Sequence, residues 1–434
     1  MKIKVKEKSY AEVMALPREA HRPPMRQLKA IRRLLKFVSE FELRETDFSY
    51  EMTGMEKLAK KEPCLILMNH SSFIDLEIAA KLLVDREYHI VCTLDGFVGK
   101  RWLMRLLGCI SARKFINDIQ LVKDMRYTVK KLNASILMYP EASYSFDGTQ
   151  TPLPESLGKC VKLLKVPVVM IKTDGAFLRD PLYNCLQKRK VQVSARMEYL
   201  LSPEEIADKS VEEINAILQE TFCMDYFKEQ QEKNIEISEP FRADGLHRVL
   251  YRCPHCESEG RMEGKGTHIK CLSCDTSYEL TPYGFLKATG KQTIFSHIPD
   301  WYRWERDCVR RELEENSYKL DLDVDIYMLI DTKCIYKVGE GRLTHNKEGF
   351  HLSGCDGQLD YKQAPQSTYS LYSDFFWYEI GDMISIGDEQ VQYYCFPKNG
   401  ENVVAKTRLA ADELYKLRKA LRKNKVKLEK VLVK

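Results

Sequence analysis

The chain lacks the features that mark membrane-spanning and secreted proteins. No apolar stretch approaches the roughly 18 residues that a transmembrane helix needs. The first residues, Met1-Lys2-Ile3-Lys4-Val5-Lys6, have no apolar centre of the kind that a secretory signal requires. With 434 residues and 44% hydrophobic content, the chain is long enough for two or three domains with cores of their own. We therefore expect a cytoplasmic protein without a membrane span.

Disulfides and a chain-wide nucleic-acid surface are also unexpected. The 14 cysteines mostly stand singly in apolar segments, so we expect reduced thiols. The net charge is only +5, but residues 1–44 hold 12 basic and 5 acidic residues, and residues 413–434 hold 9 and 2. The middle of the chain is therefore acidic overall, and no nucleic-acid partner is expected. The two basic ends suit an anionic membrane or plain solvation.

Residues 1–50 are expected to form a basic N-terminal helical region. Apolar residues recur at helical spacing from Met25 to Phe41, with basic residues between them, after the break at Pro23-Pro24. The same pattern serves a helix that packs on the domain with a solvated basic face and a helix that lies on a membrane surface. Both interpretations stay open at this point.

Residues 51–235 have the pattern of an α/β domain. Short runs rich in Val, Ile and Leu alternate with helical patterns from residue 63 to about 200. A helical stretch at about 203–231 closes this domain.

Residues 239–290 contain two CxxC pairs that predict a zinc ribbon. The pairs are Cys253 with Cys256 and Cys271 with Cys274, and fourteen residues lie between them. Two such turns place four thiolates around one zinc ion, a structural rather than a catalytic site. His255 or His268 remains an alternative ligand.

Residues 291–434 are expected to form a β-rich domain with a C-terminal helix. Short alternating segments follow Trp301, and Ala410 to Leu421 has a helical pattern. This order of strands and helix resembles a small β-barrel of the pleckstrin-homology type.

The chemistry is expected in the α/β domain, beginning with the block Asn69-His70-Ser71-Ser72-Phe73-Ile74-Asp75. It follows the apolar run from Cys64 to Met68 directly. A strand that delivers a histidine, with a carboxylate five residues later, builds a polarised general base. His351 and Asp356 repeat this spacing downstream, so order and context carry the prediction, not spacing.

Three further blocks follow in order. The segment from Gly108 to Lys114 ends in a basic cluster that includes Arg113. In Met138 to Ser145, an apolar strand ends in a proline-fixed turn that we expect to expose Glu141. Lys165 to Ile171 is a buried strand opened by a proline.

The series resembles the glycerolipid acyltransferases of the 1-acylglycerol-3-phosphate acyltransferase family, over about residues 55–200. The resemblance implies transfer of a fatty acyl group from a thioester of CoA or acyl carrier protein to a lysophospholipid hydroxyl, in phospholipid synthesis. It implies that His70 is the catalytic base and that Asp75 orients it. By the same resemblance Arg113 binds the acceptor's phosphate, and Glu141 and Ser143 line the acceptor site.

The residues agree with that chemistry. An acceptor alcohol attacks a thioester once a base removes its proton, so the enzyme needs no nucleophile of its own. A carboxylate on the second ring nitrogen fixes the tautomer of the imidazole. The backbone N–H groups of Ser71 or Ser72, at a helix start, are candidates for binding the oxyanion.

One departure keeps the acceptor open. The family's third block runs Pro-Glu-Gly-Thr-Arg-Ser, whereas this chain has Pro140-Glu141-Ala142-Ser143-Tyr144-Ser145. Alanine has less backbone freedom than glycine, and tyrosine removes a second phosphate-binding cation. We expect 1-acylglycerol 3-phosphate as acceptor, with another lysophospholipid or glycerol 3-phosphate as alternatives. The enzyme would act as a peripheral protein at the inner membrane face.

A protein of another class is the rival hypothesis. In that case the α/β domain is an inactive acyltransferase-like scaffold. The protein would instead be a zinc-ribbon binding or regulatory protein that acts through its ribbon and its β-rich domain.

Overall fold

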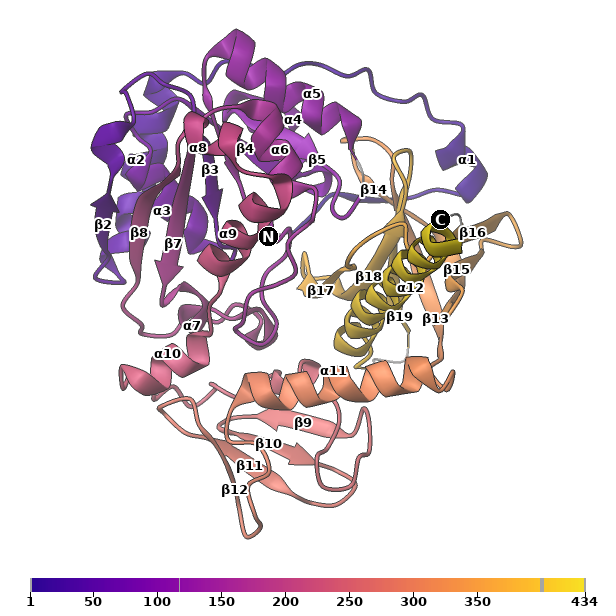
Figure 1. Cartoon of the computed structure of the whole chain (residues 1–434). Coiled ribbons are helices and arrows are strands. Elements are labelled where there is room, and N and C mark those ends of the chain that lie inside the picture. Colours follow the sequence, from indigo (N-terminus) through magenta and orange to yellow (C-terminus); the bar gives the residue numbers. More distant parts are fainter. Residues whose placement is uncertain (1, 117, 399–401, 433–434) are drawn as a thin grey trace.

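Three β-sheets organise the chain in a computed structural model that describes residues 2–116, 118–398 and 402–432 (Figure 1). The sheets have seven, four and eight strands and follow one another along the chain, except for one N-terminal strand. In the basic C-terminal segment, the side chains after Arg422 lie outside the described part. No helix in the described residues combines the length and the apolar composition needed to cross a membrane.

The seven-stranded sheet confirms the predicted α/β domain. Its order is β2-β8-β7-β3-β6-β4-β5, and every neighbouring pair is parallel except β7 with β8. The strands are β2 (Ser49–Thr53), β3 (Leu65–Met68), β4 (Tyr88–Thr93), β5 (Cys109–Ala112), β6 (Ser135–Met138), β7 (Val168–Asp174) and β8 (Ser194–Leu201). The buried strand β3 lies inside the sheet between β7 and β6, which explains its continuous apolar sequence.

Helices cover both faces of this sheet (Figure 1). One face packs against α2 (Lys29–Arg44) and α3 (Ile74–Leu82), and the other against α5 (Ile119–Tyr127), α6 (Leu157–Leu164) and α9 (Val211–Phe222). Alternate residues of β3 enter the two cores: Ile66 and Met68 face α3, whereas Leu65 and Leu67 face α6. The shorter helices are α4 (Arg101–Leu106), α7 (Ala176–Arg179), α8 (Pro203–Asp208) and α10 (Tyr226–Glu232).

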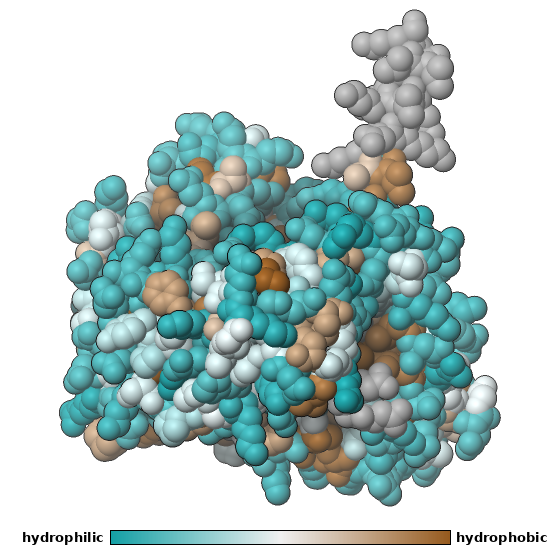
Figure 2. Space-filling view, turned by 90° about the horizontal axis from the view of Figure 1, so that it is seen from below, coloured by the Kyte–Doolittle hydropathy of each residue, from teal (hydrophilic) through white to brown (hydrophobic). Residues whose placement is uncertain are grey.

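The four-stranded sheet carries the cysteine pairs. It is antiparallel in the order β12-β11-β10-β9, with β9 (Met262–Lys265), β10 (His268–Cys271), β11 (Ser277–Leu280) and β12 (Leu286–Ala288). Helix α11 (Ile298–Glu314) lies between this sheet and the C-terminal sheet (Figure 1). On the face seen from the side of the four-stranded sheet, exposed apolar side chains are scattered among hydrophilic ones (Figure 2).

The eight-stranded sheet forms the mostly-β C-terminal region. Its main order is β16-β15-β14-β13-β19-β18-β17. The strands are β13 (Leu320–Leu329), β14 (Ile335–Asn346), β15 (Gly349–Gly354), β16 (Leu359–Gln363), β17 (Tyr372–Trp377), β18 (Gly381–Gly387) and β19 (Gln392–Pro397). The long helix α12 (Val404–Leu432) packs against α11, β17 and β18. The likeness to a pleckstrin-homology barrel stays a prediction.

The eighth strand of the C-terminal sheet comes from the N-terminal segment, and the sequence pattern did not predict this pairing. β1 (Val5–Glu7) pairs in parallel with β14, with Val5 opposite Ile335. The short helix α1 (Tyr10–Met14) follows. The predicted helix in 25–41 is α2, which begins four residues later and ends three residues later than the pattern suggested. The N-terminal segment therefore joins the C-terminal sheet to the α/β domain.

A single core cluster crosses these regions. It contains Phe146 and Phe177 from the α/β domain, Trp301 from α11, and apolar residues of both antiparallel sheets. The α/β domain and the C-terminal region thus share buried contacts and do not merely stand side by side.

Candidate active site

His70 and Asp75 form a contact at the end of the buried strand β3. His70 Nδ1 lies 3.1 Å from Asp75 Oδ2, and Asp75 stands in the first turn of α3. The Asp75 side chain is fully buried, whereas the His70 side chain keeps 20% of its surface exposed. The other ring nitrogen, Nε2, therefore remains for an acceptor hydroxyl.

The backbone of the same turn encloses the Asp75 carboxylate. Ser71 N–H donates to Asp75 Oδ2 at 2.8 Å, and Ser72 N–H donates to the same oxygen at 3.2 Å. The prediction that these N–H groups bind the oxyanion is wrong, because Asp75 already uses them. The helix start here binds the chain's own carboxylate.

The electrostatics favour a neutral imidazole. Burial lowers the pKa of His70 to about 3, and the positive charge of Lys114 adds to the decrease. Burial raises the pKa of Asp75, while the hydrogen bonds that its Oδ2 accepts from Ser71 and Ser72 N–H stabilise the carboxylate. This carboxylate accepts a hydrogen bond from Nδ1–H, which leaves Nε2 unprotonated. An imidazole that is unprotonated near pH 7 is ready to accept a proton.

Glu141 lies behind His70 and is not exposed. The strand β6 ends at Met138, and the turn after it places Glu141 with only 3% of its surface exposed. Its Oε2 accepts a hydrogen bond from His70 N–H at 2.9 Å, and its Oε1 accepts one from Thr151 N–H at 2.9 Å. The prediction that this turn exposes the glutamate is wrong: both oxygens fix the backbone around the histidine. Burial raises the pKa of Glu141 to about 7.

The residues after Glu141 give the turn an unusual shape. Ala142 stands where the family has glycine, and it adopts a left-handed conformation with φ of +57°. For a residue with a side chain this conformation costs roughly 1–2 kcal/mol. The hydroxyl of Ser143, which is 4% exposed, accepts a hydrogen bond of 2.7 Å from Arg408 Nη2 on α12.

Two tyrosine rings hold the imidazole between them. The ring centroid of Tyr144 lies 4.2 Å from that of His70, and the centroid of Tyr139 lies 4.4 Å away. Tyr144, the residue that departs from the family's block, is thus a direct neighbour of the histidine. Its phenol replaces a cation with a flat apolar surface and a hydroxyl.

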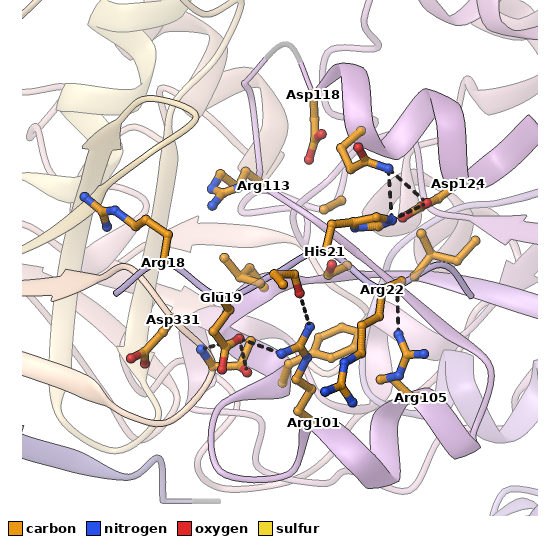
Figure 3. A pocket seen from close by; sticks show the side chains of 18 of the residues that line it. Arg18, Glu19, His21, Arg22, Arg101, Arg105, Arg113, Asp118, Asp124 and Asp331 are labelled. Carbon is orange, nitrogen blue, oxygen red and sulfur yellow. Dashed lines mark hydrogen bonds and ion pairs between the residues drawn. The ribbon is translucent and has the colours of Figure 1, made fainter. Parts of the chain in front are cut away.

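The two basic residues after β5 take different positions. Arg113 lines a pocket of about 480 Å³ beside β5, the terminal strand of its sheet (Figure 3). Lys114 instead lies over the ring of Tyr372, 4.1 Å from its centroid, and its charge acts on His70. Lys114, which the motif did not single out, therefore takes a different position from Arg113 and lies against the C-terminal sheet. Both residues lie beyond the end of β5, and no periodic sequence pattern there marks which way each cation is directed.

The arginines in the pocket mostly hold the N-terminal segment in place. Arg101 binds Glu19 at 3.0 Å, and Arg105 donates to the carbonyl of Arg22 at 2.9 Å (Figure 3). Acidic side chains, among them Asp118, share the pocket. The pocket is thus a mixed-charge junction of the N-terminal segment, β5 and the loop after β13.

The C-terminal sheet covers the motif blocks. Tyr372 of β17 donates a hydrogen bond of 2.7 Å to Asp95, and the ring of Phe375 lies 4.5 Å from that of Phe146. Together with Arg408, these residues contact the second and third blocks from a region that is remote in sequence. Nothing in the local sequence marks them, because only the folded chain brings them together.

The four cysteines come together as the sequence predicted. Their sulfur atoms all lie within 4.8 Å of one another; Cys253 and Cys274 are 3.7 Å apart, and Cys256 and Cys271 are 3.6 Å apart. Four thiolates at a Zn–S distance of about 2.3 Å in a tetrahedron stand roughly 3.8 Å apart. The four cysteine sulfurs therefore fit a zinc ion. His255, the alternative ligand, forms a hydrogen bond with Tyr278 instead.

Comparisons with known proteins agree with the site. Residues 49–172 match the family model described as Acyltransferase. A 1-acyl-sn-glycerol-3-phosphate acyltransferase, BAT2, of Brassica napus chloroplasts is 27% identical over 133 residues, which is 30% of this chain and 38% of that protein. The chain thus spans less than half the length of this relative.

Part of the chain also aligns with a solved structure. The 1-acyl-sn-glycerophosphate acyltransferase PlsC from Thermotoga maritima aligns with 45% of this chain and 78% of its own, at 16% identity and a TM-score of 0.37. The family match covers the blocks that contain His70, Asp75, Arg113 and Glu141. Residues 49–172 are therefore similar to an acyltransferase domain, and the rest of the chain lies outside this match.

Proposed function

We propose that this protein transfers a fatty acyl group from a thioester to the hydroxyl of 1-acylglycerol 3-phosphate or a related lysophospholipid, in phospholipid synthesis. The observation that carries the proposal is the buried His70–Asp75 pair at the end of β3, inside the matched domain. CoA and acyl carrier protein are both suitable carriers of the acyl group.

The reaction follows from the geometry of His70. Nε2 of the neutral imidazole takes the proton of the acceptor hydroxyl while that oxygen attacks the thioester carbonyl. The C–S bond then breaks, and the thiolate leaves with the proton that the imidazole returns. Asp75 holds the ring through Nδ1 and stabilises the imidazolium that forms between these steps.

The acceptor's phosphate is assigned to the basic block after β5. Lys114 is the cation that acts on His70, so we place the phosphate of the acceptor near Lys114, with Arg113 as the motif's own candidate. Tyr144 occupies the position of the family's second cation and contacts the histidine ring. A head group with fewer charges than a phosphomonoester suits this site as well, which keeps other lysophospholipids among the acceptors.

An anionic membrane surface is the proposed docking partner. The residues Leu34, Phe37, Val38 and Phe41 of α2 are between 58% and 63% exposed, at the spacing of one helix face. On this helix the buried residues include Arg32 and Ser39, so the apolar face is turned away from the domain. An apolar face flanked by the exposed cations Lys29 and Arg33 suits the interface of an anionic bilayer. We therefore propose a cytoplasmic enzyme, peripheral at the inner membrane face.

The four-cysteine cluster is proposed to hold a structural zinc ion. The cysteines would tie the turn before β9 to the end of β10 and so hold this small sheet together. Metal analysis of the purified protein should give one zinc per chain. Loss of the zinc from a variant with Cys253→Ser and Cys271→Ser would support the assignment, and a zinc content unchanged by these substitutions would contradict it.

Acyl transfer by the purified chain tests the proposal. Labelled acyl-CoA, and in parallel acyl carrier protein, is incubated with 1-acylglycerol 3-phosphate, other lysophospholipids and glycerol 3-phosphate. We expect transfer that the His70→Ala variant loses by about 10²–10⁴-fold. His351→Ala, which changes the histidine of the duplicated spacing, is the matched control. Wild-type rates in folded His70→Ala protein contradict the mechanism, and no transfer to any acceptor favours the scaffold hypothesis.

A further inference from the structure

Among the described side chains of α12, Arg408 is the one that bonds to the third motif block. It is 4% exposed, and its Nη2 donates to Ser143 at 2.7 Å, across 265 residues of chain. Its Cζ also lies 4.4 Å from the ring centroid of Phe146, at the far end of the same turn. Two contacts therefore connect the C-terminal helix to the turn from Tyr139 to Phe146.

This turn supports the histidine on two sides. Glu141 accepts the hydrogen bond of His70 N–H, and the ring of Tyr144 lies against the imidazole. Ser143, the residue that Arg408 holds, stands between them in the sequence. A shift of the turn would therefore move both supports of the histidine together.

The turn needs an external support because of Ala142. A left-handed residue with a side chain is strained, and a turn that contains one relaxes unless its surroundings hold it. Burial gives the hydrogen bond between Arg408 and Ser143 added strength, because no water competes for the serine oxygen.

We propose that Arg408 is a positioning residue for acyl transfer: its bond to Ser143 keeps the turn from Tyr139 to Phe146, and through it His70, in the reactive geometry. The C-terminal region is then part of the catalytic unit. This inference rests on the proposed function, and it concerns a residue far outside the matched family domain.

The first test separates positioning from binding. We expect Arg408→Gln to lower kcat by roughly 10- to 100-fold, with KM for both substrates changed less than kcat. Arg408→Lys, which can still donate one hydrogen bond to Ser143, should recover part of the loss. Arg418→Gln is the matched control, since Arg418 lies on the same helix but donates to the carbonyl of Lys347 within the C-terminal region. A folded Arg408→Gln protein with wild-type kcat overturns the proposal.

The second test uses the strain at Ala142. Glycine adopts a positive φ without strain, so Ala142→Gly should let the turn keep its shape without the arginine. We expect Ala142→Gly alone to change kcat little, and the double variant with Arg408→Gln to recover at least part of the lost activity. Failure of this rescue, with both proteins folded, contradicts the coupling.

The third test does not depend on catalysis. Hydrogen exchange of the peptide from residue 139 to 149 should be faster in Arg408→Gln than in the wild type, and slower again in the double variant. If the wild type transfers no acyl group but the exchange follows this order, the proposed function fails and the support by Arg408 stands. Unchanged exchange in Arg408→Gln, together with active wild-type protein, rejects the support alone.

Discussion

The two turns that flank His70 are held in different ways. The turn after β3 is local: Asp75 binds the ring of His70 and the backbone of Ser71 and Ser72, all within five residues. The turn after β6 contains a strained Ala142 and is held by Arg408 from the last helix. A local turn forms with its own strand and helix, whereas the second depends on the completed C-terminal region. The difference separates the residues that perform the chemistry, His70 and Asp75, from the turn that keeps His70 in position.

Asp75→Asn should break the local turn and have the largest effect. An asparagine there offers no charge to the imidazolium and no longer favours the correct tautomer, so we expect kcat to fall by about 10²–10⁴-fold. Steady-state kinetics with saturating acceptor measure this. Asp356→Asn, in the duplicated spacing, should leave kcat unchanged, and an equal loss in both variants would contradict the assignment.

Glu141→Gln should weaken the link between the two turns. The amide keeps one oxygen but brings an NH₂ group to face a backbone N–H, from either His70 or Thr151. One buried donor then stays unsatisfied, which we expect to lower the free energy of unfolding by roughly 1–3 kcal/mol. Urea denaturation measures the loss; a variant as stable as the wild type would show that the glutamate bonds matter little.

Asp374→Asn should change how stability depends on pH at the contact between β17 and the motif blocks. Burial raises the pKa of Asp374 from 3.8 to about 7, while Lys114 and Arg408 act to lower it and Asp95 to raise it. The folded chain thus keeps a proton that the unfolded chain loses above about pH 4. The stabilisation from this group is complete below that pH and is lost as the pH rises through 7.

The measurement is the free energy of unfolding at several pH values between 4.5 and 8. The wild type should lose stability with rising pH more steeply than Asp374→Asn. Equal slopes in the two proteins would show that Asp374 does not carry this effect.

Charged substitutions on α2 should have the smallest effect on the chemical step, because α2 belongs to neither of the two turns around His70. Phe37→Glu with Phe41→Glu places charges on the exposed apolar face, so binding to vesicles that contain an anionic phospholipid should weaken. With a short-chain acceptor dissolved as monomers, kcat should stay at the wild-type level. Vesicle flotation and kinetics measure the two quantities, and a loss of kcat with the dissolved acceptor would contradict the division of roles.

Short-range features of the site were predictable from sequence. The apolar run before His70 and the carboxylate in the next helix are close in the chain, so the order of a buried strand followed by a helix placed them correctly. The four cysteines also converge as their two CxxC turns predicted. In each case the chain between the residues is too short to allow many arrangements.

Long-range features were not predictable in this way. The burial of Glu141 depends on Thr151 and on the backbone of another strand's end, and the motif shows neither. The positions of Arg113 and Lys114 depend on how the chain after β5 packs against the N-terminal segment and against Tyr372 of the C-terminal sheet. Arg408 and β1 contact partners hundreds of residues away, where no local pattern records the pairing.

The pairing of β1 with β14 has a consequence for the order in which the protein is made. Val5 leaves the ribosome long before its partner Ile335, which follows only after the α/β domain and the cysteine sheet. Arg408 is synthesised later still. A nascent chain can therefore already contain the pair of His70 and Asp75 while its first strand has no partner and the turn after β6 has no support. During synthesis, activity should therefore appear only once α12 has been made and Arg408 reaches the turn.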